Sequence, residues 1–232
     1  MATESLTHDS PDGVTCPCCG GTFTHFLPHG VHPRPRARCP ACGSLERHRL
    51  TALYLTHKTT LFHERLSVLD IAPHPSLLRL FSTLPHLDYL SADLHSPLAM
   101  VKTDICDMPF PTDSFDVIVC MHVLEHVPDD RQALRELYRV LKPGGWAIVQ
   151  VPLVYKQRET LEDPRVTAPE DRERLFGQHD HVRRYGLDYE ERLRDAGFAV
   201  ELVSCPTELG PDAVARYGLK RNRDRYLWMC RM

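Results

Sequence analysis

The sequence lacks any long apolar run. No stretch reaches the ~18–20 consecutive apolar residues that a membrane-spanning helix requires, so we expect no membrane segment. The N-terminal residues MATESLTHDSPDG also lack the basic start and following apolar stretch of a secretory signal. We therefore expect residues 1–12 to form a disordered lead, and we expect the protein to be cytoplasmic.

A large excess of charge is also missing. The formal net charge is −3, and 25% of the 232 residues are charged, which argues against a general polyanion binder but leaves room for a local basic patch. With 42% apolar residues, the chain is long enough for one good-sized core and a small appendage.

The nine cysteines do not form the pattern of a disulfide-bonded secreted protein, because five of them lie in the first fifth of the chain. The sequence contains two copies of a Cys-Pro-x-Cys-Gly turn, CPCCG and CPACG, and nineteen residues separate their Cys-x-x-Cys pairs. Each turn brings two sulfurs within reach of one ion, and four thiolates complete a closed, structural zinc site. The expected ligands are Cys16, Cys19, Cys39 and Cys42; packed or redox-active cysteines are the alternative.

A basic segment lies between and after these turns. Residues 31–49 contain five arginines, Arg34, Arg36, Arg38, Arg47 and Arg49, opposed only by Glu46. This segment is either a solvated face or a patch for an anionic substrate such as RNA. A helix is expected from Ser44, with Ser44 as its cap and Leu50, Leu53, Tyr54 and His57 on one face. We expect a zinc-ribbon-like module with its linking helix over residues 13–60.

From residue 61 to 232, apolar runs of strand length alternate with amphipathic stretches, which is typical of a parallel sheet with crossover helices. The expected strands are 67–71, 88–92, 100–103, 115–120, 146–151, 199–203 and 226–231, the last two antiparallel. Helices are expected near 76–84, 129–141 and 189–196. The fold class is therefore α/β, with a doubly wound, seven-stranded, Rossmann-like sheet that binds ligands beyond the carboxyl ends of its strands.

The segment DICDMPFPTDSFDVIVCMHVLEHVPDDRQALRELYRVLKPGGWAIVQVP resembles the central block of class I S-adenosylmethionine-dependent methyltransferases of the type 11 group. Three elements match in order: Asp-x-x-x-x-Pro-Phe, His-Val-Leu-Glu-His-Val, and Leu-Lys-Pro-Gly-Gly. The resemblance covers about residues 66–204 and implies a seven-stranded methyltransferase sheet that uses S-adenosylmethionine.

The resemblance also implies the cofactor site. Asp93, 23 residues beyond Asp70, fits the carboxylate that accepts hydrogen bonds from the ribose, although it could be a solvated aspartate at a strand end. Asp104 takes the position that binds the adenine amino group, with Ile105 beside the ring. The full set of expected cofactor-binding residues is Asp70, Ala72, His74, Asp93, Leu94, Asp104, Ile105, Cys120 and Met121. In the Leu-Lys-Pro-Gly-Gly element, Lys142 is expected in the last turn of the helix, before a turn at Gly144-Gly145.

The first turn of the sheet lacks the glycines of the family motif Asp-x-Gly-x-Gly. The chain has Asp70-Ile71-Ala72-Pro73-His74 instead. Alanine adds only a methyl group, whereas His74 is costly if its position needs a positive φ. We interpret the turn as a rebuilt cofactor turn, in which His74 contacts the cofactor or substrate; a lost cofactor site is the alternative.

A long polar insert, residues 155–189, precedes the next clear helix and corresponds to a substrate-covering lid in the family. The candidate bases are His122, His179 and His181, because a positioned imidazole takes a proton from a hydroxyl. Arg183, Arg184 and Tyr185 are candidate substrate-binding residues, since arginine binds carboxylates and phosphates. The alternatives are a lid closed by its own ion pairs, with His181 and Arg183 facing the sheet, or a metal held by His179 and His181.

The chain also lacks an Asn-Pro-Pro-Tyr-like element after the fourth strand, and CMHVLEH resembles enzymes that act on oxygen or carbon. We therefore expect methylation of a small-molecule acceptor at oxygen. An RNA methyltransferase that grips RNA with its zinc module and arginines is one alternative, and a non-catalytic binding protein with the same fold is another. The sequence leaves the acceptor and the oligomeric state open.

Overall fold

A seven-stranded mixed sheet forms the centre of the molecule in the computed structural model, which describes residues 13–30, 33–204, 209–219 and 226–232. The strand order is β12-β13-β9-β8-β5-β6-β7. Its members are β5 (Leu66–Ile71), β6 (Leu87–Asp93), β7 (Val101–Lys102), β8 (Phe115–Met121), β9 (Leu141–Gln150), β12 (Ala199–Ser204) and β13 (Tyr226–Arg231). The expected doubly wound sheet is confirmed, as is the antiparallel pairing of the last two strands.

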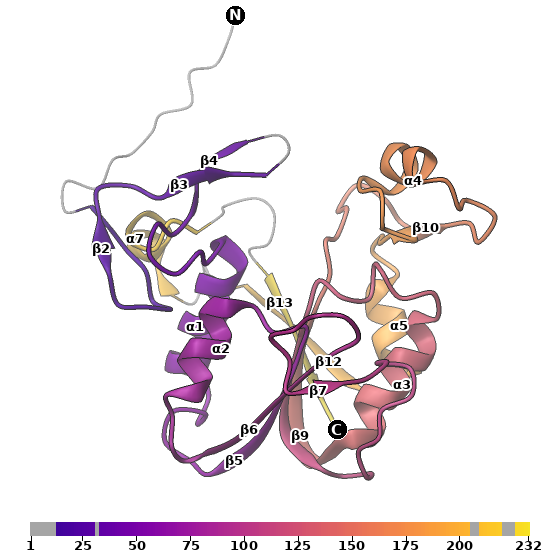
Figure 1. The fold of residues 1–232 in the computed structure, drawn as a ribbon, viewed down its shortest axis with the longest axis horizontal. Coiled ribbons are helices and arrows are strands. Elements are labelled where there is room, and N and C mark those ends of the chain that lie inside the picture. Colours follow the sequence, from indigo (N-terminus) through magenta and orange to yellow (C-terminus); the bar gives the residue numbers. More distant parts are fainter. Residues whose placement is uncertain (1–12, 31–32, 205–208, 220–225) are drawn as a thin grey trace, which may run out of the picture.

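Helices cover both faces of the sheet because each face carries its own apolar cluster. On one face lie α1 (Glu46–Lys58) and α2 (Pro75–Ser82), and on the other lie α3 (Asp130–Val140) and α5 (Tyr189–Asp195) (Figure 1). Leu69 and Ile118 belong to the cluster of α3 and α5, whereas Val68 and Val117 belong to that of α1 and α2. Consecutive strand residues thus point to opposite faces, as the period of a strand requires.

The central strands end together at one edge of the sheet. In the register of the parallel strands, Ile71 lies beside Ala92 on one side and beside Cys120 on the other. The turns that follow β5, β6 and β8 therefore converge at this edge. A parallel sheet binds ligands at such an edge, outside the carboxyl ends of its strands.

The turn between α3 and β9 differs in detail from the expectation. Asp129 caps α3 by accepting a hydrogen bond from the backbone N–H of Gln132 at 2.9 Å. The helix ends at Val140, so Lys142 is not in its last turn, and its ammonium instead pairs with Asp116 at 2.8 Å. The expected turn at Gly144-Gly145 falls inside β9: Gly144 has a φ of 78°, and the register of β9 against β8 shifts between Phe115 and Val117.

The N-terminal module consists of two small hairpins, followed by α1. They pair β1 (Val14–Thr15) with β2 (Thr22–Phe23), and β3 (Leu27–His29) with β4 (Arg34–Arg38). The expectation that Ser44 caps α1 is wrong, because Leu45 is the N-cap and its N–H donates to Nδ1 of His48. The Ser44 hydroxyl lies 3.1 Å from the sulfur of Cys16 instead. His57, expected on the buried face, is exposed.

Arg49 is not part of a basic surface. Its side chain is fully buried, and its guanidinium lies 3.9 Å from the centre of the Phe26 ring. It donates hydrogen bonds to the carbonyls of Ala37 and Ser44 in the module, and to those of Tyr217 and Gly218 after α7 (Pro211–Arg216). One arginine therefore fastens a C-terminal segment onto the N-terminal module.

The insert at residues 155–189 contains more regular structure than expected. Helix α4 (Pro169–Phe176) begins at a proline and ends at Gly177, whose φ is 93°. Strands β10 (Leu161–Glu162) and β11 (Arg183–Arg184) pair antiparallel. The insert forms a lobe beside α3 and α5 (Figure 1). No helix in the described ranges is long and apolar enough to cross a membrane.

Candidate functional site

The turn after β5 places its strained residue at Ala72 and not at His74. Ala72 has a φ of 54°, whereas His74 has a φ of −84° and is the N-cap of α2. The His74 ring accepts from the N–H of Ser76 at 3.3 Å and lies 2.8 Å from the Ser76 hydroxyl. His74 therefore does not adopt the positive φ that would have been costly. The left-handed conformation falls on Ala72 instead, whose side chain is small.

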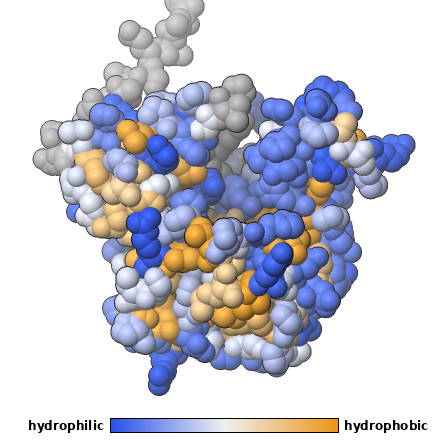
Figure 2. Space-filling view, viewed as in Figure 1, coloured by the Kyte–Doolittle hydropathy of each residue, from blue (hydrophilic) through white to orange (hydrophobic). Residues whose placement is uncertain are grey.

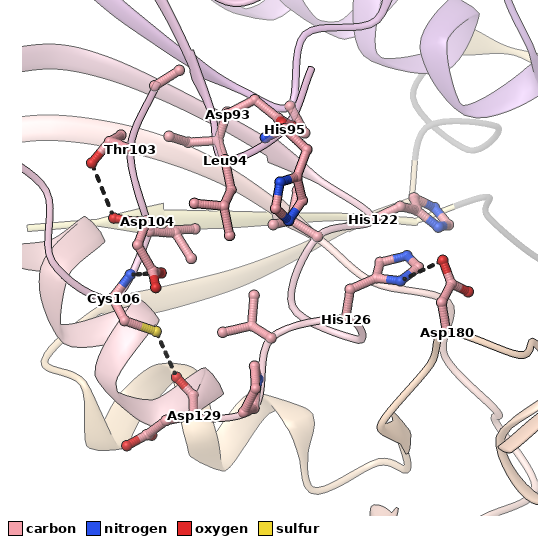
Figure 3. A pocket seen from close by; sticks show the side chains of 17 residues that line it. Asp93, Leu94, His95, Thr103, Asp104, Cys106, His122, His126, Asp129 and Asp180 are labelled. Carbon is pink, nitrogen blue, oxygen red and sulfur yellow. Dashed lines mark hydrogen bonds and ion pairs between the residues drawn. The ribbon is translucent and has the colours of Figure 1, made fainter. Parts of the chain in front are cut away.

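A cavity of about 620 Å³ opens at the carboxyl ends of β5, β6 and β8 (Figure 3). Its size is in the ~300–1,000 Å³ range of small-molecule and cofactor pockets. Six residues predicted as site residues line it: Ala72, Asp93, Leu94, Asp104, Ile105 and His122. In the space-filling view, the surface is hollowed between the N-terminal module and the insert lobe, with hydrophilic residues at its border (Figure 2).

Strained backbone marks two sides of this cavity. Among the described residues, four other than glycine have a positive φ, and two of them, Ala72 and His122, line the cavity. His122 has a φ of 58° at the end of β8, and its N–H donates to the carbonyl of Gln150 at 2.7 Å. Such conformations persist where the surroundings enforce them, and they cluster at functional sites.

Two carboxylates at one end of the cavity are held by the backbone. Oδ1 of Asp93 accepts from the N–H groups of His95 and Ser96, both at 2.6 Å. Oδ1 of Asp104 accepts from the N–H of Cys106 at 2.8 Å. Because these short turns fix the side chains, both carboxylates are oriented before any ligand arrives.

Four residues predicted to bind the cofactor do not line the cavity. Asp70 and Cys120 are buried, and Met121 lies against α1, where its sulfur is 3.5 Å from the Thr51 hydroxyl. The His74 ring stacks on the His48 ring, with their centroids 3.8 Å apart. These residues support the walls of the site, and the His48–His74 stack joins the helix of the N-terminal module to the turn at Ala72.

Asp70 is the most strongly perturbed carboxyl near the cavity. Complete burial raises its pKa to about 7, and the hydrogen bond from the Tyr89 hydroxyl at 2.9 Å opposes this rise. Burial also raises the pKa of Tyr89. Asp70 therefore serves as the hydrogen-bond acceptor for a tyrosine of the neighbouring strand β6.

Ionisable side chains gather at the other end of the cavity. Nδ1 of His122 lies 3.3 Å from Oε1 of Glu125, and Nδ1 of His126 lies 3.2 Å from Oδ2 of Asp180 (Figure 3). The His126 and His181 rings meet edge to face, 4.7 Å apart. Burial lowers the pKa of His181, so it favours the neutral imidazole. A base, or a ligand for a cation, is available at this end.

Two polar atoms in this group lack hydrogen-bond partners. Nε2 of His122 and Oε2 of Glu125 are both buried without one, and Glu125 is only 1% exposed. A buried polar atom without a partner costs about 1–3 kcal/mol, and more when it is charged. A ligand or an ion bound at this end of the cavity would give these two atoms a partner.

The prediction that Arg183 and Tyr185 bind substrate is wrong, because both side chains are buried in contacts within the protein. Arg183 pairs with Glu162 at 2.9 Å, and the Tyr185 hydroxyl donates to Asp130 at 2.7 Å. Arg184 donates to the Gln157 side chain at 3.0 Å. Arg183 accordingly fits the alternative in which ion pairs of the insert hold it against the sheet.

Arg183 also fixes the segment that carries Glu125 and His126. Its guanidinium donates to the carbonyls of Leu124, Val127 and Pro128. The N–H of Val182 donates to the carbonyl of Glu125 at 2.8 Å. The returning strand of the insert therefore positions the ionisable end of the cavity, although it does not bind ligand itself.

The candidate bases separate in space. His122 lines the cavity and His181 contacts His126, whereas His179 is exposed and does not line the cavity. The cavity is also lined by Asp180, which was expected to position a histidine base, and by His126 and Asp129, to which the sequence analysis assigned no role. The Glu-His pair within His-Val-Leu-Glu-His-Val was the available signal for His126.

The four cysteines predicted as ligands meet at one point of the N-terminal module. Their sulfurs all lie within 4.8 Å of one another, with Cys16 and Cys42 at 3.6 Å and Cys19 and Cys39 at 3.8 Å. A tetrahedral ion with Zn–S bonds of ~2.3 Å separates its sulfurs by about 3.8 Å. Contact with Cys16, together with burial, raises the pKa of the Cys42 thiol to about 12.

Comparison with known proteins agrees with the fold. Residues 59–149 match the family described as "Methyltransferase domain". The demethylmenaquinone methyltransferase of Listeria welshimeri is 48% identical over 54 residues, which are 23% of this chain and 22% of that protein. The chain thus aligns with about a fifth of the length of this relative.

Solved structures extend the likeness to most of the chain. An S-adenosylmethionine-dependent methyltransferase from Mesorhizobium loti superposes with a TM-score of 0.55 at 18% identity, covering 79% of this chain and 98% of that one. The 1,6-didemethyltoxoflavin-N1-methyltransferase of Burkholderia thailandensis, solved with S-adenosylhomocysteine, has a TM-score of 0.51 at 16% identity, covering 80% and 77%. The resemblance carried by the sequence motifs is confirmed: residues 59–149 belong to a methyltransferase domain, within a chain that has the fold of the S-adenosylmethionine-dependent methyltransferases.

Proposed function

We propose that this protein is an S-adenosylmethionine-dependent methyltransferase that methylates a small-molecule acceptor at oxygen. The observation that carries the proposal is the cavity at the carboxyl edge of the sheet, with fixed carboxylates at one end and half-buried histidines at the other. The first end has the chemistry to bind a nucleoside and the second has the chemistry to accept a proton.

The residues around Ala72, Asp93 and Asp104 fit S-adenosylmethionine. A carboxylate at the end of the second strand accepts hydrogen bonds from ribose hydroxyls, and Asp93 ends β6. Asp104 offers an acceptor for an exocyclic amine, and a site built to accept that bond rejects an analogue without the donor. When bound, the cofactor supplies an electrophilic methyl group on its sulfonium. The αL turn at Ala72 lets the backbone lie beside the cavity.

On the acceptor side, His122 and His181 are the candidate bases. His122 lies in the cavity wall with Glu125 at 3.3 Å, and a carboxylate partner orients an imidazole and stabilises its protonated form. The chain's own task is to align the acceptor oxygen and to receive its proton. The name of the Listeria relative points to quinone-like rings as acceptors, so hydroxylated aromatic compounds are the first class to test.

The N-terminal cysteine cluster is proposed as a structural zinc site. Four cysteines leave no open position for a substrate, so the ion would organise the module without taking part in methyl transfer. The contacts of two arginines of the basic segment weaken the RNA alternative. Arg34 pairs with Glu46 at 3.2 Å, and Arg49 is buried. Binding of RNA would fall steeply with salt, whereas binding of a neutral small molecule would not.

Calorimetric titration of S-adenosylmethionine and S-adenosylhomocysteine into the zinc-loaded protein tests the proposal. We expect micromolar binding, and we expect Asp93→Ala to weaken it at least tenfold, which corresponds to about 1.4 kcal/mol. Asp88→Ala is the matched control, because Asp88 is exposed on the same strand, away from the carboxyl edge. It should bind as the parent protein does.

Two results would contradict the proposal. Absence of binding at millimolar cofactor would favour the non-catalytic alternative. If the cofactor binds, incubation with labelled cofactor and a panel of hydroxylated aromatic compounds should yield an O-methyl product, identified by mass spectrometry. A methyl group attached to carbon or nitrogen would overturn the assignment to oxygen.

A further inference from the structure

The ionisable end of the cavity contains a second set of metal-ligating side chains. Glu125, His126 and His181 each offer one ligand atom, and these atoms lie within 4.8 Å of one another. They come from the segment after β8 and from the insert, which are far apart in the sequence. Because Arg183 and the N–H of Val182 bind that segment, the two parts are held together.

The buried carboxylate of Glu125 indicates that a cation is missing from this set. The residue is 1% exposed, its Oε2 has no hydrogen-bond partner, and its Oε1 contacts only an imidazole nitrogen, Nδ1 of His122, at 3.3 Å. Buried carboxylates are ordinarily paired with a cationic side chain or coordinate a metal ion. Glu125 belongs to the ligand set, and a metal ion bound there would compensate its carboxylate.

The histidines are arranged as metal ligands commonly are. Asp180 lies 3.2 Å from Nδ1 of His126, and a carboxylate on one ring nitrogen fixes the tautomer that presents the other nitrogen to a metal (Figure 3). His181 is half-buried, and its ring meets that of His126 edge to face with the centroids 4.7 Å apart. Both His126 and Asp180 line the cavity, so an ion here would face a bound acceptor.

We propose that Glu125, His126 and His181 bind a divalent transition-metal ion at the acceptor end of the cavity. Two imidazoles and one carboxylate are a ligand set of Fe²⁺, Mn²⁺ and related ions, and they leave open positions on the ion. This site is separate from the cysteine cluster, whose soft thiolates select zinc.

The open positions define the class of acceptor, an inference that rests on the proposed function. An acceptor with two adjacent oxygens, such as a catechol, can chelate the ion, which lowers the pKa of the bound hydroxyl. The hydroxyl then gives its proton to His122 or to solvent, and the oxygen lone pair forms the new O–C bond. As that bond forms, the bond from the methyl carbon to sulfur breaks and its electron pair stays on the sulfur.

Electron paramagnetic resonance of Mn²⁺ added to the zinc-loaded protein tests the site without any turnover. Mn²⁺ is a weak competitor for thiolates, so it should leave the cysteine cluster intact. We expect one bound Mn²⁺ per chain, and at least tenfold weaker binding in Glu125→Gln and in His181→Ala. His57→Ala is the control, because His57 is exposed on α1 and outside the cavity; it should bind Mn²⁺ unchanged.

Circular dichroism and binding of S-adenosylhomocysteine show whether each variant is folded. Folded variants that bind Mn²⁺ as tightly as the parent protein would overturn the site. Absence of binding of both Mn²⁺ and Co²⁺ at millimolar concentration would also overturn it.

Two isomeric acceptors test the role of the ion. We expect Mn²⁺ to raise methylation of catechol at least tenfold, and to leave methylation of hydroquinone, whose hydroxyls lie opposite one another, unchanged. Equal stimulation of both isomers would overturn the chelating role. If the cofactor fails to bind while Mn²⁺ binds in the expected way, the proposed function fails and the metal site stands.

Discussion

Two groups of carboxylates differ in how their charge is compensated. Asp130 and Glu162 meet the guanidinium of Arg192 at 2.9 and 2.8 Å, and these arginine contacts lower the pKa of Glu162 to about 2. Asp70 has only a tyrosine hydroxyl as its partner, and burial raises its pKa to about 7. Glu125 has a histidine and an unsatisfied oxygen.

This difference distinguishes carboxylates that stabilise the fold from those that lack a cationic partner within the protein. The first group is complete within the protein, so its role is to hold the insert on the sheet. We have proposed that the thiols of the N-terminal module and the carboxylate of Glu125 each bind a cation. Four sets of variants test this difference.

The largest effect is expected from removing the cation of the cysteine cluster. Chelation or Cys39→Ser should unfold the N-terminal module, because the binding free energy of a structural zinc, about 10–16 kcal/mol in small peptides, is folding free energy. Thermal unfolding and zinc content should both fall. Cys18→Ser is the control, since Cys18 lies outside the four-sulfur group, and it should keep its zinc. Unchanged melting of the Cys39 variant would contradict the zinc assignment.

The next largest effect is expected where Arg192 pairs with Asp130 and Glu162. Arg192→Met leaves Asp130 buried without its close guanidinium partner, and breaking such a pair costs about 3–5 kcal/mol. Urea denaturation would measure this loss. Arg194→Met on the same helix is the control, because that exposed arginine pairs only with Glu190 and should cost less than about 1 kcal/mol. Equal losses of stability in the two variants would contradict a structural role for the ion pairs of Arg192.

Asp70 should make stability depend on pH. Its folded pKa, about 7, lies above its ordinary value of 3.8, so between these values the folded state binds more protons than the unfolded state. The free energy of unfolding should therefore fall as the pH rises from about 4 to 7. Urea denaturation of Asp70→Asn across this range should show a weaker fall. Asp88→Asn, at an exposed site, should keep the parent profile.

The smallest effect is expected at the rebuilt turn. Ala72→Gly relieves a left-handed alanine, worth about 1–2 kcal/mol, but adds about 0.5–1 kcal/mol of backbone entropy, so a gain of roughly 0.5 kcal/mol is expected. His74→Gly should instead lower stability by about 1 kcal/mol, because it removes the cap and the stack on His48. Thermal unfolding of both variants measures these changes in stability. A His74→Gly variant more stable than the parent would contradict a stabilising role for the cap and the stack.

Local patterns were enough to predict the sheet, and they failed where distant segments meet. The alternation of apolar strands and amphipathic helices predicted the strands and α3, because burial of one face imposes those periods. The same patterns missed α4, whose polar sequence buries only Phe176. They also misassigned Arg49 and Arg183, because an arginine that donates to buried carbonyls is locally indistinguishable from a solvated one.

Patterns along the chain were enough to predict the fold class, the meeting of four cysteines in one cluster, and the carboxylates at the ends of the strands. Each of these follows from residue spacing within or between neighbouring segments. Tertiary structure decided which residues face the cavity, where the strained residue of the turn lies, and that Glu125 and His126 meet His181. Those outcomes depend on contacts between segments distant in the chain. Such contacts produce no periodic pattern in the local sequence, so they could not be predicted from it.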